Sequence, residues 1–78
     1  MSYIDDQHVM FIETKNDSQY AQYICMFLNR QIGIIVWHEN IDSYVFVPQN
    51  NTLGYMTANV LLDIYIQLFS LMKERILS

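Results

Sequence analysis

The side chains that could carry out catalysis are few in this chain. Cys25, His38 and Asp42 are residue types that can supply a nucleophile, a base and an orienting group. Their spacing gives no reason for them to meet, and a lone cysteine in an apolar segment is mostly a small buried hydrophobe. The chain also has no glycine-rich phosphate loop. We therefore expect no catalytic residues and a protein that is not an enzyme.

Metal and nucleic-acid sites are not indicated either. His8 and His38 have no cysteine or second histidine at ligand spacing, so we expect no metal and no cofactor. Eight acidic and four basic residues give a net charge of −4. The four basic residues are scattered along the chain and form no stripe that could neutralise phosphates. We therefore expect no direct nucleic-acid partner.

The length of 78 residues predicts a single domain spanning 1–78. One cysteine excludes an intramolecular disulfide, and the N-terminus lacks a signal-peptide pattern, so we expect a cytoplasmic protein. The longest apolar-rich run, Val60 to Met72, is interrupted by polar residues and is shorter than the roughly 20 residues that span a bilayer. We therefore expect no membrane partner. However, 53% of the residues are hydrophobic, which is more than so small a fold easily hides, and this favours a protein partner.

Two kinds of hydrophobic pattern divide the chain. Short β-branched and aromatic runs predict strands at His8–Glu13, Ile32–His38 and Ser43–Val47, and Pro48 ends the sheet because it cannot donate to a ladder. From Thr57 to about Leu77 the spacing is helical, with Thr57 as the N-cap. These patterns predict an α+β fold: a small antiparallel sheet of three to four strands with a long C-terminal helix packed on one face.

The segment Tyr20–Leu28 fits two structures. Tyr20, Tyr23, Ile24 and Phe27 recur at helical spacing, and periodicity alone therefore favours a helix. The same residues are aromatic and β-branched, and the letters LNRQ suit a tight turn into the next strand. A helix here would give a β-α-β-β-α layout, which is the alternative fold.

The C-terminal helix has an apolar arc wider than one sheet can cover. Four of its residues extend the arc: Val60, Leu62, Ile66 and Phe69. A self-complementary apolar patch of this kind suits a two-fold contact, so we expect these residues to form a homodimer interface. The open face of the sheet is a second candidate for this contact.

The predicted strands also carry aromatic side chains on alternate positions. Tyr44 and Phe46 lie on one side of their strand, and Trp37 lies with Ile35 on one side of the strand before it. We expect them to contact a partner or a ligand. Folding of the N-terminal segment over the face that the helix leaves uncovered is the competing interpretation.

A series of short motifs resembles a group of small proteins encoded by phages and other mobile elements. The motifs are Ile32-Gly33, Trp37, the letters YVFVP at 44–48, Thr52, and LLDI at 61–64. The match covers about Tyr20 to Leu68, whereas the turn HENID departs from the group's pattern. The resemblance implies that Tyr20–Leu28 is a second strand, giving a four-stranded antiparallel sheet with one helix across a face, and we adopt that order.

The resemblance implies a genomic context rather than a chemistry. Small accessory proteins of phages commonly act by blocking a host machine, as inhibitors of restriction or of CRISPR effectors do. We therefore expect a non-enzymatic protein that binds a host protein in the bacterial cytoplasm. The alternative is a small-molecule or nucleotide sponge or sensor, with an aromatic pocket at a subunit junction.

Overall fold

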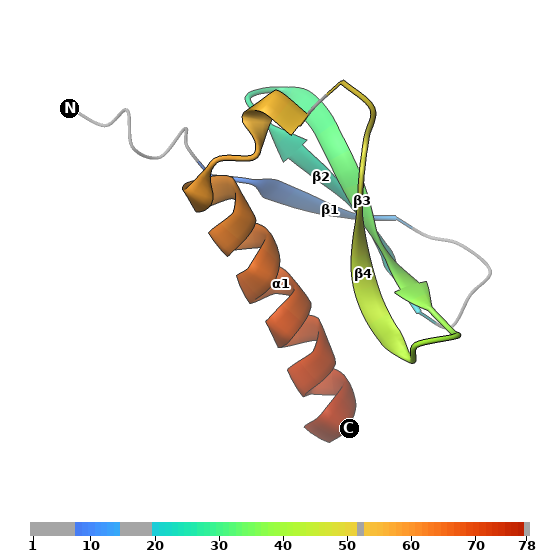
Figure 1. Ribbon diagram of the computed structural model, residues 1–78. Coiled ribbons are helices and arrows are strands. Elements are labelled where there is room, and N and C mark those ends of the chain that lie inside the picture. Colours follow the sequence, from blue (N-terminus) through green and yellow to red (C-terminus); the bar gives the residue numbers. More distant parts are fainter. Residues whose placement is uncertain (1–7, 15–19, 52, 78) are drawn as a thin grey trace.

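Four strands follow one another across a single antiparallel sheet, and one helix crosses one side of it (Figure 1). The computed structural model describes residues 8–14, 20–51 and 53–77. The elements are β1 (Met10–Thr14), β2 (Gln22–Phe27), β3 (Arg30–His38), β4 (Ser43–Pro48), the short 3₁₀ helix η2 (Leu53–Tyr55) and α1 (Ala58–Leu77). This arrangement confirms the predicted α+β class, and the β-α-β-β-α alternative is wrong.

The segment that fitted two structures is strand β2, so the helix suggested by its periodicity is wrong. Leu28 and Asn29 have φ angles of 52° and 62° and form the two-residue turn that pairs Phe27 with Arg30. Positive φ at both turn residues matches the twist of a β-hairpin. The helical spacing was misleading because both faces of β2 are apolar, which hides the period of two.

An irregularity in β3 places Ile32 in the core. Cys25 pairs with Gly33 and Met26 pairs with Gln31, so Ile32 is the extra residue of a β-bulge. Its carbonyl accepts the Gln49 N–H at 2.9 Å, which keeps β3 joined to the chain beyond β4. The side chain of Ile32 is fully buried. Simple alternation predicts that Ile32 shares the face of Ile34, and the bulge makes that prediction wrong.

Two sets of contacts fix the start of α1, one to its own N-cap and one to the chain before β1. The Val60 N–H donates to Thr57 Oγ1 at 3.3 Å, and the Leu61 N–H donates to the Thr57 carbonyl at 3.0 Å, which confirms Thr57 as the N-cap. Asp63 Oδ2 accepts the Val9 N–H at 3.0 Å and lies 3.3 Å from His8 Nδ1. These contacts tie the chain just before β1 to the first turns of the helix.

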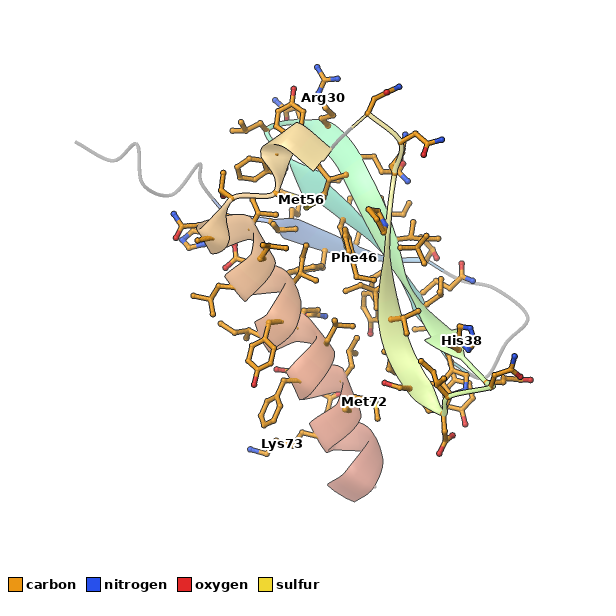
Figure 2. The ribbon with its side chains drawn as sticks, viewed as in Figure 1. Arg30, His38, Phe46, Met56, Met72 and Lys73 are labelled. Carbon is orange, nitrogen blue, oxygen red and sulfur yellow. The ribbon has the colours of Figure 1, made fainter. Side chains whose placement is uncertain are left out.

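The interior lies between α1 and one side of the sheet. Val60, Ile64 and Leu71 come from the helix and are buried. They form one cluster with Val9, which precedes β1, and with four residues of β2 and β3: Cys25, Phe27, Ile32 and Ile35. Phe46 packs against this cluster from β4 (Figure 2).

Gly33 permits a close contact between β3 and the ring of Phe46. A Cβ at position 33 would lie 2.6 Å from Phe46 Cζ and 2.5 Å from the Val47 carbonyl oxygen. Real Cβ atoms do not approach other atoms so closely, and a backbone oxygen held in a ladder cannot move aside cheaply. The absence of a side chain at Gly33 therefore lets Phe46 lie across the strand.

We predict that Gly33→Ala lowers the free energy of unfolding by about 1–3 kcal/mol, because the added methyl overpacks this contact. Gly54→Ala is the matched control, since a Cβ there meets nothing within 4 Å. Its effect should stay within about 0.5 kcal/mol. Urea unfolding of the three proteins measures the difference, and equal effects of the two substitutions would contradict the packing role of Gly33.

Candidate functional site: two open apolar surfaces

The helix α1 covers only one of the two faces of the sheet. The ladder pairs Phe11 with Cys25, and Ile35 with Phe46, so these four side chains share the face toward α1. Figure 1 shows α1 on this side of the sheet, with no labelled element on the other side. A single helix thus covers one face of the four strands.

The other face is apolar across all four strands. Ile12 pairs with Ile24, Ile24 with Ile34, and Ile34 with Val47, so one row of aliphatic side chains crosses the sheet. With their neighbours these residues form what we name the open sheet face: Met10, Ile12, Ile24, Met26, Ile34, Val36, Val45 and Val47. Met10 is 64% exposed, and Ile12 and Val47 are each 44% exposed. An apolar surface this continuous is characteristic of a binding interface.

A second apolar surface runs along α1 on the side away from the sheet. We name it the helix stripe, and its residues are Leu61, Leu62, Tyr65, Ile66 and Phe69, each more than half exposed. The rings of Tyr65 and Phe69 are stacked with centroids 6.1 Å apart. Lys73 lies on the same side of α1 (Figure 2). Three of the residues predicted for self-association, Leu62, Ile66 and Phe69, lie in this stripe.

Val60 does not belong to that surface. Its side chain is 0% exposed because it points into the cluster between α1 and the sheet. The prediction that Val60 takes part in self-association is therefore wrong. Val60 lies one turn before Ile64 on the buried side of the helix, and the wide apolar arc made these two sides hard to separate in the sequence.

The aromatic residues predicted to bind a partner lie on the helix-covered face. The Trp37 ring stacks on Tyr20 with centroids 4.2 Å apart, and Tyr44 meets both rings edge-on. Trp37, Tyr44 and Phe46 are all half-buried, and Phe46 covers Gly33. Their contacts in the structure are with this chain, and their role in binding a partner stays a prediction.

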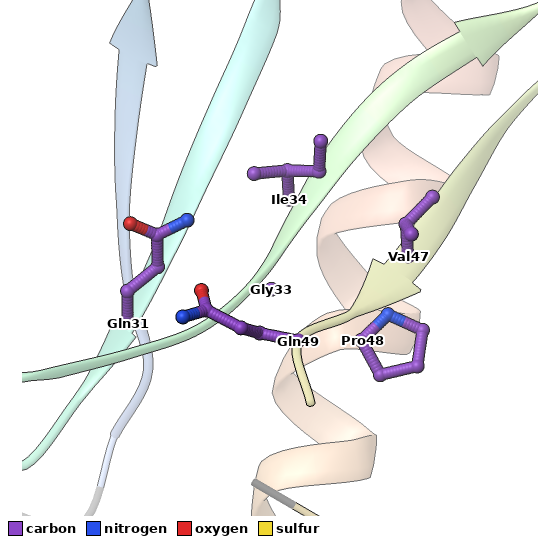
Figure 3. A pocket seen from close by; sticks show the side chains of 6 residues that line it. All are labelled: Gln31, Gly33, Ile34, Val47, Pro48 and Gln49. Atoms are coloured by element: carbon purple, nitrogen blue, oxygen red, sulfur yellow. The ribbon is translucent and has the colours of Figure 1, made fainter. Parts of the chain in front are cut away.

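A shallow depression of about 180 Å³ lies where β3 begins and β4 ends, near the rim of the open sheet face (Figure 3). Its lining combines two glutamines with small and aliphatic residues: Gln31, Gly33, Ile34, Val47, Pro48 and Gln49. Small-molecule sites usually measure about 300–1,000 Å³. The depression is therefore a notch in a larger surface rather than a ligand pocket.

The residues considered for catalysis are not brought together. Cys25 is buried opposite Gly33, whereas His38 lies at the far end of β3, about 16 Å along the strand from Gly33. Asp42 lies in the exposed turn that follows. Within residues 8–14, 20–51 and 53–77, no three His, Cys, Asp or Glu side chains are grouped as metal ligands. The described residues also contain no helix long and apolar enough to cross a membrane.

Comparisons of the chain with protein-family models, curated proteins and solved structures found no match. The two candidate surfaces are therefore identified from the exposure and pairing of their residues. Sequence reasoning missed Met10, Ile12 and Met26 as members of the open sheet face. The signal was present in the alternation of β1, where Met10 and Ile12 flank Phe11, but assigning the face required the strand pairing.

Burial changes the ionisation of two groups under the helix. It raises the pKa of the Cys25 thiol from 9.0 to about 12. Burial also raises the pKa of Tyr23, and the nearby Glu13 carboxylate adds to the shift. Both groups therefore keep their protons to a higher pH in the folded protein than in the unfolded chain, and the Cys25 thiol is not a reactive nucleophile near neutral pH.

We predict that stability falls as the pH rises above about 9. The unfolded thiol loses its proton near its ordinary pKa, whereas the folded thiol keeps it until about pH 12. Deprotonation therefore stabilises the unfolded state, by at most about 1.4 kcal/mol per pH unit. Urea unfolding at pH 8, 9 and 10 measures this loss. The control variant Cys25→Ala should lose less stability over that range, and an identical loss would contradict the assignment.

Proposed function

We propose that the protein is not an enzyme and acts by binding another protein through the helix stripe. The observation that supports this proposal is the exposure of five large apolar side chains on the side of α1 opposite the core. Aromatic anchors of this kind commonly supply most of the energy of a protein interface. The stacked pair Tyr65 and Phe69 would be the anchor here.

The stripe suits a partner with an apolar groove. Leu62, Ile66 and Phe69 follow the i, i+4, i+7 spacing with which an amphipathic helix lies in such a groove. Asn59, Ser70 and Lys73 are exposed beside them and would form a polar rim. Burial of each large side chain contributes about 1.5–3 kcal/mol before the cost of association is subtracted.

We propose further that the bound protein belongs to a defence machine of a bacterial host, and that binding blocks it inside the host cell. The resemblance to small phage proteins supports this class of target, and the lack of a basic stripe in the sequence favours a protein target over DNA or RNA. A small domain without a catalytic constellation can inhibit by occupying a surface that the machine needs.

A nucleotide sponge or sensor is the other function considered, and it has less support. Tyr20 already stacks on Trp37 with centroids 4.2 Å apart, in the position a base would take on that side of the indole ring. The depression near Gln31 and Gln49 is smaller than typical ligand sites. Our proposal is therefore the protein-binding function.

We predict that expression of the protein raises phage plating at least tenfold on cells that carry a restriction or CRISPR system, and has no effect on cells without one. Phe69→Glu should abolish this protection, because it replaces one ring of the aromatic anchor of the helix stripe by a charge. Ser70→Glu is the matched control, since it adds the same charge at an exposed rim position.

Purified restriction and CRISPR nucleases then provide a test without cells. DNA cleavage by at least one of them should be inhibited by the unmodified protein and by Ser70→Glu, but not by Phe69→Glu. Lack of protection in every strain, together with uninhibited cleavage by every nuclease, would rule out the proposed class of target. Equal inhibition by both variants would rule out the helix stripe as the contact.

A further inference from the structure

We infer that the open sheet face binds a second copy of this chain, so that two sheets pack face to face with their α1 helices on the outside. This contact is separate from the helix stripe and does not depend on the identity of the target. The two-fold axis would pass near Ile24 and Ile34, which occupy the middle of the aliphatic row. Sheets stacked in this way lie about 10 Å apart.

The composition of the face matches the centre of a protein interface. Its eight members are all aliphatic residues or methionines, and charged residues are depleted from the centre of such interfaces. Polar residues border this apolar centre: Gln22 pairs with Thr14 at one end, and Gln31 pairs with Met26 at the other. An apolar centre with a polar rim is the usual anatomy of a protein interface.

The distribution of charge favours a second copy as the occupant. With a net charge of −4, two copies repel each other wherever their carboxylates meet. The charged side chains that the structure describes lie in the turns, on the helix-covered face and on α1: Glu13, Arg30, Glu39, Asp42, Asp63, Lys73 and Glu74. The open sheet face carries none of them, so two copies can meet there without placing acidic groups in contact.

The area of the face sets the expected strength of the dimer. Four strands about 4.8 Å apart, each with about five residues rising about 3.3 Å, span about 19 by 17 Å. Two copies would bury roughly 600–700 Å² in projection, and the accessible area is larger because the side chains are corrugated. Even with that increase the contact stays below the about 1,200 Å² at which standard specific interfaces begin, in the range of weak and transient contacts. We therefore expect a dissociation constant in the micromolar range.

Sedimentation velocity from about 1 to 200 µM tests the inference. The unmodified protein should shift from monomer to dimer over this range. Ile34→Lys should remain monomeric, because the two-fold axis brings the two charges together in an apolar centre. Phe69→Lys, on the helix stripe, is the matched control and should dimerise like the unmodified protein. Circular dichroism checks that each variant is folded.

Mixing two oppositely charged variants tests whether Ile34 of one copy lies next to Ile34 of the other, as a two-fold axis requires. Ile34→Lys and Ile34→Glu should each be monomeric alone, and an equimolar mixture should form heterodimers through opposite charges. If either variant fails to fold, Ile34→Thr replaces it, since threonine keeps the β-branched shape; it should weaken dimerisation at least tenfold. The inference is overturned if the unmodified protein is monomeric at 200 µM, if folded Ile34 variants dimerise normally, or if Phe69→Lys alone abolishes the dimer.

Discussion

One helix can cover only one face of a four-stranded sheet, and in this protein both faces of the sheet are apolar. The row Ile12, Ile24, Ile34 and Val47 crosses all four strands on the side opposite α1. Antiparallel sheets with one solvated face normally alternate apolar and polar residues. Here the chain lacks a described element to cover the second face. Contact with a second copy of the chain is the arrangement that we infer for this face.

The covered side of the sheet is built to hold α1 firmly in place. The bulge turns Ile32 inward, and Gly33 lets Phe46 lie across β3 beneath the helix. Thr57 caps the helix, and Asp63 accepts the Val9 N–H and thereby ties α1 to the start of β1. Because these contacts fix the helix on one side, the open sheet face and the helix stripe point in opposite directions. A dimer formed through the sheet would therefore present two helix stripes on its outer surfaces.

Much of this fold could be predicted from local patterns. The predicted strands at Ile32–His38 and Ser43–Val47 and the helix from Thr57 agree with β3, β4 and α1 to within a few residues. The errors arose where both sides of an element are apolar, because hydrophobicity then carries no information about direction. This is why β2 suggested a helix, and why Val60 could not be told from Leu62 as an exposed residue.

The candidate site was harder to predict than the fold. Membership of the open sheet face depends on strand register, which pairs Met10 with Met26 although they are far apart in the sequence. Gly33 beside Ile32 is the kind of residue that often marks a bulge, but the sequence alone does not show which residue is the extra one. The aromatic residues Trp37 and Tyr44 were conspicuous in the sequence, yet they pack with Tyr20 on the covered side.

We infer that a second copy of the chain covers the open sheet face in solution. An isotope-filtered NOE experiment on a mixture of labelled and unlabelled protein observes contacts between copies directly. A dimer formed through this face should give intermolecular methyl contacts from Ile24, Ile34 and Val45, and none from the buried Val60. Intermolecular contacts confined to Leu62 and Ile66, or no intermolecular contacts at concentrations above the expected dissociation constant, would contradict it.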